Sequence, residues 1–343
     1  MDTIPLCHDS QLILVNADAL PLALREPRRF AGALAPDGET CRAWAQKFDS
    51  LPVGLALDCP AVPEDEEPRP HTLRYIERCK AVFRDRLHDD AAFYYVRGAS
   101  GFPALRAAVL ALTDLSGRTV IAELPVEDDE GHMPDGTETR AAIGVLQRIG
   151  VSTVILAAHT PEALTETLEE VAPYARLSVG VSIHSAWLRA GTPLYNTELF
   201  LPVEHDGEAR LLEALEAHGE LRTVPRDHDD FILAPDGNHA HFIDPTIDIS
   251  DEIEVGHRLE EALVDFEDES GALKLVLETE DDVIALEEQR HMISRPVCLC
   301  AESAELLEQG LRVYPGLALY DGTWEQPEEV LHYLEQKYGL IRL

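Results

Sequence analysis

Two cysteines flank a single leucine in the segment RPVCLCAES, residues 295–303. In a strand, side chains alternate with a period of two, so Cys298 and Cys300 would lie on one face. Paired thiols suggest a zinc site or a redox pair, but none of the six cysteines forms the CxxC spacing of zinc ribbons and thioredoxins. The interpretation we favour is a buried parallel strand that uses small sulfur residues. Cys300, at the end of that strand, stays a weak candidate metal ligand.

A second group of candidate ligands is the histidine-rich segment 219–258. His239 and His241, in the sequence HAH, would lie on one side of an extended strand, where a carboxylate could complete a divalent metal site. A polar surface hairpin is the favoured alternative, because APDGNH is a turn signal between DDFIL and HAHFI. The other charged members of the group are His228, His257, Asp227, Asp229, Asp230 and Asp244.

Polar residues also follow or end several apolar runs that we predict to be strands. Barrel enzymes carry their chemistry at the carboxyl ends of their strands. His159 and His184 are candidates for a metal ligand or a general base there, and a carboxylate-rich mouth with one arginine would suit a small polar or cationic ligand. No residue is assigned a catalytic role. The predicted pocket-lining residues are Asp58, Cys59, Arg97, Glu123, His159, His184, Cys300 and Asp321.

The elements that would position these residues alternate between short apolar runs and amphipathic helical segments. Continuous apolar strands are typical of parallel sheets covered on both faces, and the β–helix–β order indicates an α/β fold. The number of units favours a (β/α)8 barrel over an open sheet. GxGxxG, P-loop and GxSxG motifs are absent. The predicted strands are 11–16, 53–59, 92–98, 119–125, 152–158, 177–183, 272–278, 296–300, 317–322 and 339–343.

The composition is that of an acidic globular protein. The chain has 343 residues, 64 acidic and 28 basic, which gives a formal net charge of −36. Such a surface repels phosphate backbones and anionic lipids, so nucleic acid and membrane partners are not expected. The sequence lacks a signal-peptide pattern and an apolar run of roughly 20 residues. We therefore expect a cytoplasmic protein with reduced cysteines.

Residues 127–164 carry the most specific pattern in the chain. Asp135, Gly136 and Thr137 form a DGT turn that opens a helix, a strand follows, and Pro161-Glu162 open the next helix. This order is similar to the homocysteine S-methyltransferase domain of cobalamin-dependent methionine synthase. Residues 89–112 and 178–196 resemble neighbouring units of the same barrel.

Residues 271–324 resemble the first strands of the pterin-binding barrel that follows in methionine synthases. The residues at the strand ends differ from that family. Its Asp-Ser-Ser is replaced by Cys300-Ala301-Glu302, and its asparagine by Asp321.

The first resemblance implies a zinc ion that binds homocysteine as a thiolate, held by one cysteine after the sixth strand and a Cys-Cys pair after the eighth. This sequence has Ala157-Ala158, then His159, at the first position, and contains no GGCCG. Arg97-Gly98 stand where the family has Glu-Thr. The family zinc ligands are therefore missing, and the cofactor stays open.

These observations predict three parts: a homocysteine S-methyltransferase-like barrel part (1–225), an irregular acidic, histidine-rich insertion or linker (226–258), and pterin-binding-like βα units (259–343). Because half a barrel would expose sheet edges, we expect the last part to complete one composite barrel with the first. The predicted function is a methyltransferase of one-carbon and methionine metabolism. The alternative is a non-catalytic relative, a pseudoenzyme that binds a small polar ligand or a protein partner of the methionine synthase type.

Overall fold

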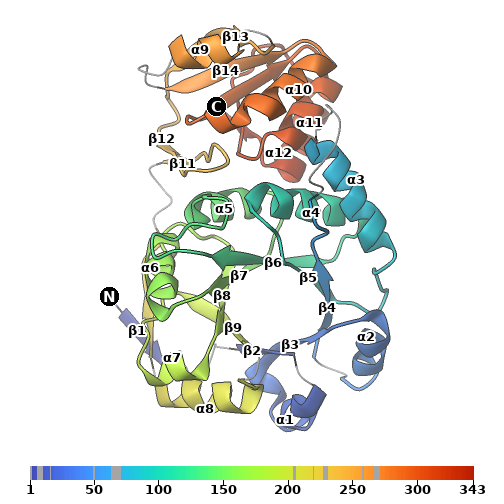
Figure 1. The fold of residues 1–343 in the computed structure, drawn as a ribbon, viewed down its shortest axis with the longest axis vertical. Coiled ribbons are helices and arrows are strands. Elements are labelled where there is room, and N and C mark those ends of the chain that lie inside the picture. The colour runs from blue at the N-terminus through green and yellow to red at the C-terminus, as the bar shows by residue number, and fades with distance from the viewer. Residues whose placement is uncertain are drawn as a thin grey trace.

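Eight parallel strands close into a barrel in the computed structural model of the chain (Figure 1). The model describes residues 2–5, 11–15, 17–48, 51–62, 71–203, 206–218, 220–226, 231–256, 259–265 and 271–343. Closure is made by β2 and β9, where Gln11 pairs with Leu199 and Leu12 with Phe200. The predicted α/β class and (β/α)8 barrel are confirmed. The barrel strands are β2 (Gln11–Leu14), β3 (Phe30–Ala35), β4 (Val53–Asp58), β5 (Phe93–Arg97), β6 (Thr119–Val126), β7 (Thr153–Ala158), β8 (Ser178–Ile183) and β9 (Thr197–Pro202).

Helices follow the strands and surround the barrel (Figure 1). The start of the sixth helix is encoded locally: the Thr160 hydroxyl accepts a hydrogen bond from the amide of Ala163, and Pro161 occupies the first turn. Among the described residues, no helix is long and apolar enough to cross a membrane. The helices are α1 (Leu20–Arg25), α2 (Gly38–Ala45), α3 (His71–Arg84), α4 (Phe102–Leu115), α5 (Thr139–Leu146), α6 (Pro161–Val171), α7 (Ser185–Arg189) and α8 (Glu208–His218).

The inside of the barrel is filled by its own cluster of side chains. Phe93 and Tyr95 point inward from β5, and glycine at position 54 makes room for the Phe93 ring. A Cβ at Gly54 would lie 2.2 Å from Phe93 Cε2. The interior is therefore a packed core, which leaves the ends of the barrel as places for a ligand. The other buried members of the cluster are Ile13, Leu34, Ala56, Ile121, Ile155 and Leu201.

A second unit is built on a separate five-stranded parallel sheet. The prediction of a composite barrel is wrong. The eight strands β2 to β9 close the barrel by themselves, because β2 pairs with both β3 and β9, and no strand edge is left for the second unit to complete. The strands are β13 (Ile249–Glu254), β14 (Ala272–Leu277), β15 (Val297–Ala301), β16 (Leu319–Tyr320) and β17 (Ile341–Arg342). They alternate with α9 (Leu259–Asp265), α10 (Glu280–Gln289), α11 (Ala304–Val313) and α12 (Glu328–Tyr338), and a 3-10 turn, η3 (Arg290–Met292), follows α10.

The segment between the two units contains short antiparallel pairs. β10 (Glu220–Thr223) pairs with β1 (Asp2–Pro5). β11 (Ile232–Leu233) pairs with β12 (Phe242–Ile243), which confirms the predicted hairpin around APDGNH. The segment is less irregular than predicted, since β10 and β13 also fall within 219–258.

The second unit packs beside the barrel, with α10, α11 and α12 near α3 and α4 (Figure 1). Arg106 of α4 is 2% exposed, and its guanidinium donates to the carbonyls of Leu311 (2.7 Å) and Arg312 (3.0 Å) at the end of α11. The amide of Thr72 donates to Glu287 Oε1 of α10 at 2.7 Å. Buried polar contacts thus join the two units into one molecule.

Candidate functional site at the barrel mouth

A cavity of about 520 Å³ lies at the carboxyl end of the barrel. Its lining comes from β3, β5, β6, β8 and β9, from Val15 just after β2, and from the start of α8, so most sides of the barrel contribute. This is the end where (β/α)8 enzymes place their active sites. The lining residues are Val15, Leu34, Tyr95, Arg97, Glu123, Ser182, Leu201, Pro202, Val203, Asp206, Gly207 and Glu208.

Strand alternation places Glu123 in this cavity. Ile121 belongs to the interior cluster, and Glu123 is two residues further along β6, so it points the same way. The hydroxyl of Tyr95 donates to Glu123 Oε2 at 2.5 Å. Burial, together with the neighbouring Glu123 charge, raises the pKa of Tyr95 well above its usual value, so the phenol keeps its proton. The carboxylate of Glu123 is thus held in one orientation by a neutral donor.

Arg97 is the cation at the mouth, and it lies two residues beyond Tyr95 on β5. Its Nε donates to Asp58 Oδ1 at 2.8 Å, because Asp58 at the end of β4 pairs in register with Arg97. Among the described residues no hydrogen bond uses the two terminal nitrogens of Arg97, which leaves donors for a ligand. A guanidinium of this kind can bind a carboxylate through two parallel hydrogen bonds.

Two further carboxylates come from the connection between β9 and α8. Glu208, 2% exposed, accepts the amide of Val15 through Oε1 at 2.8 Å. Asp206 accepts from the amide of Ser185 and from its hydroxyl, the latter at 2.7 Å. With Glu123, three carboxylates line the cavity against the single guanidinium of Arg97. This balance favours a ligand that carries a positive charge.

Some of the predicted pocket residues lie outside this lining. Asp58 is at the rim, where it holds Arg97. Cys59 is one residue further along the chain and therefore faces away from the barrel interior. Its thiol is covered by surrounding protein, and this burial raises the pKa of the thiol to about 12. His159 has a side chain that is 73% exposed, with Nε2 at 3.6 Å from Glu127 Oε2. His184 is exposed at the start of α7, and its ring lies 5.3 Å from that of Trp187.

Cys300 and Asp321 lie in the second unit, away from the barrel mouth. Strand β15 is buried along its whole length between parallel neighbours, as predicted for CLC. Within the described part of the chain, Cys298, Cys300 and Asp321 form the one group of three possible metal ligands, with their ligand atoms within 4.8 Å of one another. Lys274 Nζ lies 3.0 Å from Asp321 Oδ2 and already neutralises that carboxylate. The contact with Cys300, and burial, raise the pKa of the Cys298 thiol. These features favour a neutral Cys298 thiol beside the ion pair of Lys274 and Asp321.

The two histidines of HAH contact a buried carboxylate, that of Asp236. His241 Nε2 lies 2.9 Å from Asp236 Oδ2, and His239 Nδ1 lies 3.4 Å from the same oxygen. Burial alone would raise the pKa of Asp236, but His241 and the amides of His239 and Asn238 outweigh it and lower the pKa. The carboxylate thereby stabilises the turn between β11 and β12. The residues predicted beside this pair, His228, His257, Asp227, Asp229 and Asp230, lie outside the described residues, and Asp244 accepts from Thr246.

The residues at the mouth do not fit the zinc ion that the sequence resemblance implies. Among the described residues that line the cavity, none is a cysteine or a histidine. Carboxylates can contribute to a catalytic zinc site, but the common ligand sets each contain histidine or cysteine as the majority of their ligands. No chemical step is therefore derived through zinc.

Four polar side chains of the lining were not predicted from the sequence: Tyr95, Ser182, Asp206 and Glu208. Tyr95 and Ser182 carried a usable signal, because each lies in the inward phase of a predicted strand. Asp206 and Glu208 carried none, since the strand before them, β9, was not recognised.

No protein-family model matches this sequence, and no curated protein matches it at a significant level. Among solved structures, it is similar to the apo form of the homocysteine methyltransferase MmuM from Escherichia coli, with 14% identity and a TM-score of 0.44 over 62% of this chain and 97% of that one. The metallated form gives 15% identity and a TM-score of 0.43, over 62% and 96% of the two chains. At these values the likeness carries no conclusion about activity, and the barrel architecture rests on the strand pairing of the chain itself.

Proposed function

We propose that the barrel mouth binds an amino acid with an unbranched side chain of about the size of methionine's, and that it does so without zinc. The observation that carries the proposal is the charge arrangement of the cavity. Glu123, Asp206 and Glu208 supply negative charge for an ammonium group, and Arg97 supplies donors for a carboxylate.

The apolar part of the lining supports the same ligand class. Leu34 and Leu201 belong to the interior cluster and also line the cavity, and Val15 lies beside them at the end of β2. A ligand bound here would have its apolar side chain on these residues and its charged groups toward Arg97 and Glu123. Small-molecule sites commonly combine an apolar wall with a few polar groups that fix orientation.

A second candidate is the activity implied by the sequence resemblance, methyl transfer to homocysteine. The order of motifs in residues 127–164 favours it. The two candidates share an amino acid ligand and differ in zinc, which only the second requires. Because none of the described residues that line the cavity is a cysteine or a histidine, we favour the non-catalytic alternative: a barrel that binds its amino acid without transferring a methyl group.

The ammonium group is the feature to test. Thermal unfolding of the wild-type protein is measured with L-homocysteine or L-methionine, and then with 4-(methylthio)butanoate, which is methionine without its amino group. We expect the amino acids to raise the melting temperature, since a ligand at a hundred times its dissociation constant stabilises a protein by about 2.7 kcal/mol. The deaminated compound is expected to give no shift.

The opposite results would remove the proposal. Equal shifts with methionine and its deaminated analogue would show that the carboxylates of the cavity do not recognise an ammonium group. No shift with either amino acid at millimolar concentration would rule out the ligand class.

A further inference from the structure

A second cavity, separate from the barrel mouth, lies between α3, α4 and η3 of the second unit. Its volume is about 270 Å³, and it shares no lining residue with the mouth cavity. Ligand pockets commonly measure roughly 300–1,000 Å³, so this one is suited to a small molecule.

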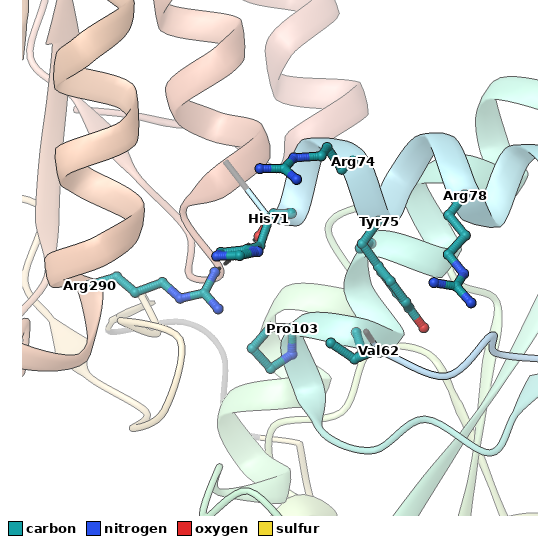
Figure 2. A pocket seen from close by; sticks show the side chains of 10 residues that line it. Val62, His71, Arg74, Tyr75, Arg78, Pro103 and Arg290 are labelled. Carbon is teal, nitrogen blue, oxygen red and sulfur yellow. Dashed lines mark hydrogen bonds between the residues drawn. The ribbon is translucent and has the colours of Figure 1, made fainter. Parts of the chain in front are cut away.

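Basic side chains surround this cavity. Figure 2 shows Arg290 extending from the second unit toward His71, while Arg74 and Arg78 project from α3. Among the described lining residues there is no aspartate or glutamate. Three arginines and a histidine thus gather in one small cavity of a chain whose formal net charge is −36.

Some of these side chains have hydrogen-bond or ion-pair partners within the protein, and others have none among the described residues. Arg290 Nη1 donates to Thr72 Oγ1 at 3.1 Å and lies 3.7 Å from Glu287 Oε1, so that nitrogen holds the two units together. Among the described residues, no hydrogen bond or ion pair is made by Arg78 or by the ring of His71. The guanidinium of Arg78 and the ring of His71 are therefore available to a ligand.

The floor of the cavity is apolar and partly aromatic. Pro103 and Val62 lie below His71 and Arg74 in Figure 2, and the ring of Tyr75 lies between Val62 and Arg78. Ala104 and Ala107 also line this wall. The Tyr75 hydroxyl donates to the carbonyl of Pro60 at 2.7 Å, which fixes the ring. A rigid apolar wall beside guanidinium groups is suited to a ligand with an anionic end and a flat or apolar body.

The basic cluster contrasts with the negative net charge of the chain. A strongly negative molecule repels anions at long range, and at physiological ionic strength that repulsion is screened beyond about 8 Å. Binding of an anion must therefore come from charges in direct contact with it. The cluster at α3 and η3 meets that requirement.

We propose that the cavity formed by His71, Arg74, Arg78 and Arg290 over Tyr75 and Pro103 binds a small organic anion, phosphate- or carboxylate-bearing, with an apolar or aromatic body. This site goes beyond the proposed function of the barrel mouth. It lies between the two units, so its ligand contacts both.

Calorimetric titration of the full chain with phenyl phosphate, benzoate and inorganic phosphate tests the proposal. We expect phenyl phosphate or benzoate to bind, whichever matches the anionic group, and to bind at least about tenfold more tightly than inorganic phosphate because of the apolar wall. Arg78→Gln is expected to weaken that binding about tenfold, since it removes a charge-assisted contact.

Arg84→Gln is the matched control, because Arg84 is an exposed arginine at the end of the same helix and outside the cavity. It should leave the affinity within about twofold of the wild type, since surface charges are screened. Equal weakening by Arg84→Gln and Arg78→Gln would overturn the proposal by showing a general charge effect. Inorganic phosphate binding as tightly as phenyl phosphate would overturn the role of the apolar wall, and absence of binding by all three probes would overturn the site.

Discussion

Replacing Arg106 with methionine is expected to lower the free energy of unfolding by about 2–4 kcal/mol. The guanidinium donates to the carbonyls of Leu311 and Arg312, two of the last carbonyls of α11, which have no partner within the helix. Methionine fills much of the same space but donates nothing, so both carbonyls lose their partner. Urea unfolding followed by circular dichroism measures the change.

Two further variants serve as controls for Arg106→Met. Arg106→Lys keeps the positive charge but not the forked donor, so its loss of stability should be intermediate. Arg118→Met removes an exposed arginine that donates to the carbonyl of Asp89 at 3.1 Å, and it should change the free energy of unfolding by less than about 0.5 kcal/mol. A loss for Arg106→Met no larger than that for Arg118→Met would contradict the role given to the buried contact.

Replacing Glu123 with glutamine is expected to weaken amino acid binding at the barrel mouth by about 10- to 100-fold, because a hydrogen bond to a charged group contributes about 1.5–3 kcal/mol. Glutamine has the same shape, and its carbonyl oxygen still accepts the Tyr95 hydroxyl, so the wall of the cavity should stay in place. Titration calorimetry with L-methionine measures the loss.

The control for this variant is Glu127→Gln. Glu127 follows β6 as well, but its side chain is 58% exposed and lies outside the cavity lining. We expect its affinity for L-methionine to match that of the wild type. An unchanged affinity in Glu123→Gln, or an equal loss in both variants, would show that Glu123 does not contact the ammonium group.

The local elements could be predicted from the sequence, and the closure of the barrel could not. The helix predicted from FPALRAAVLALTDL is α4, Phe102–Leu115, and the run at 152–158 is β7. Strand β3 was missed because four of the six residues of FAGALA are alanine or glycine, which have little preference for strands. Strand β9, TELFLP, was missed because it mixes polar residues with a proline.

Those two omissions produced the error about the second unit. With six strands recognised before residue 200, a barrel needed two more, and the strands after residue 271 were the remaining candidates. The pairing of β2 with β9 joins residues that are nearly the whole barrel apart in sequence, and local patterns carry no information on such a pairing.

Only part of the site at the barrel mouth could be predicted, because strand ends can be recognised from local sequence and the connections after them cannot. Arg97 and Glu123 end strands and line the cavity, as expected for barrel residues. Applied to β4, the same alternation separates Asp58 from Cys59, which were predicted to line one mouth together. Glu208 is placed in the cavity by the fold around α8, which no strand-end rule could anticipate.

The central claim is that the barrel mouth binds its amino acid without zinc. The most direct test is titration of chelator-treated wild-type protein with L-homocysteine, first alone and then after one equivalent of zinc. We predict one binding event per chain, with the same dissociation constant before and after zinc is added. Binding that appears only with zinc, at one ion per chain, would contradict the claim and favour thiolate activation at this mouth.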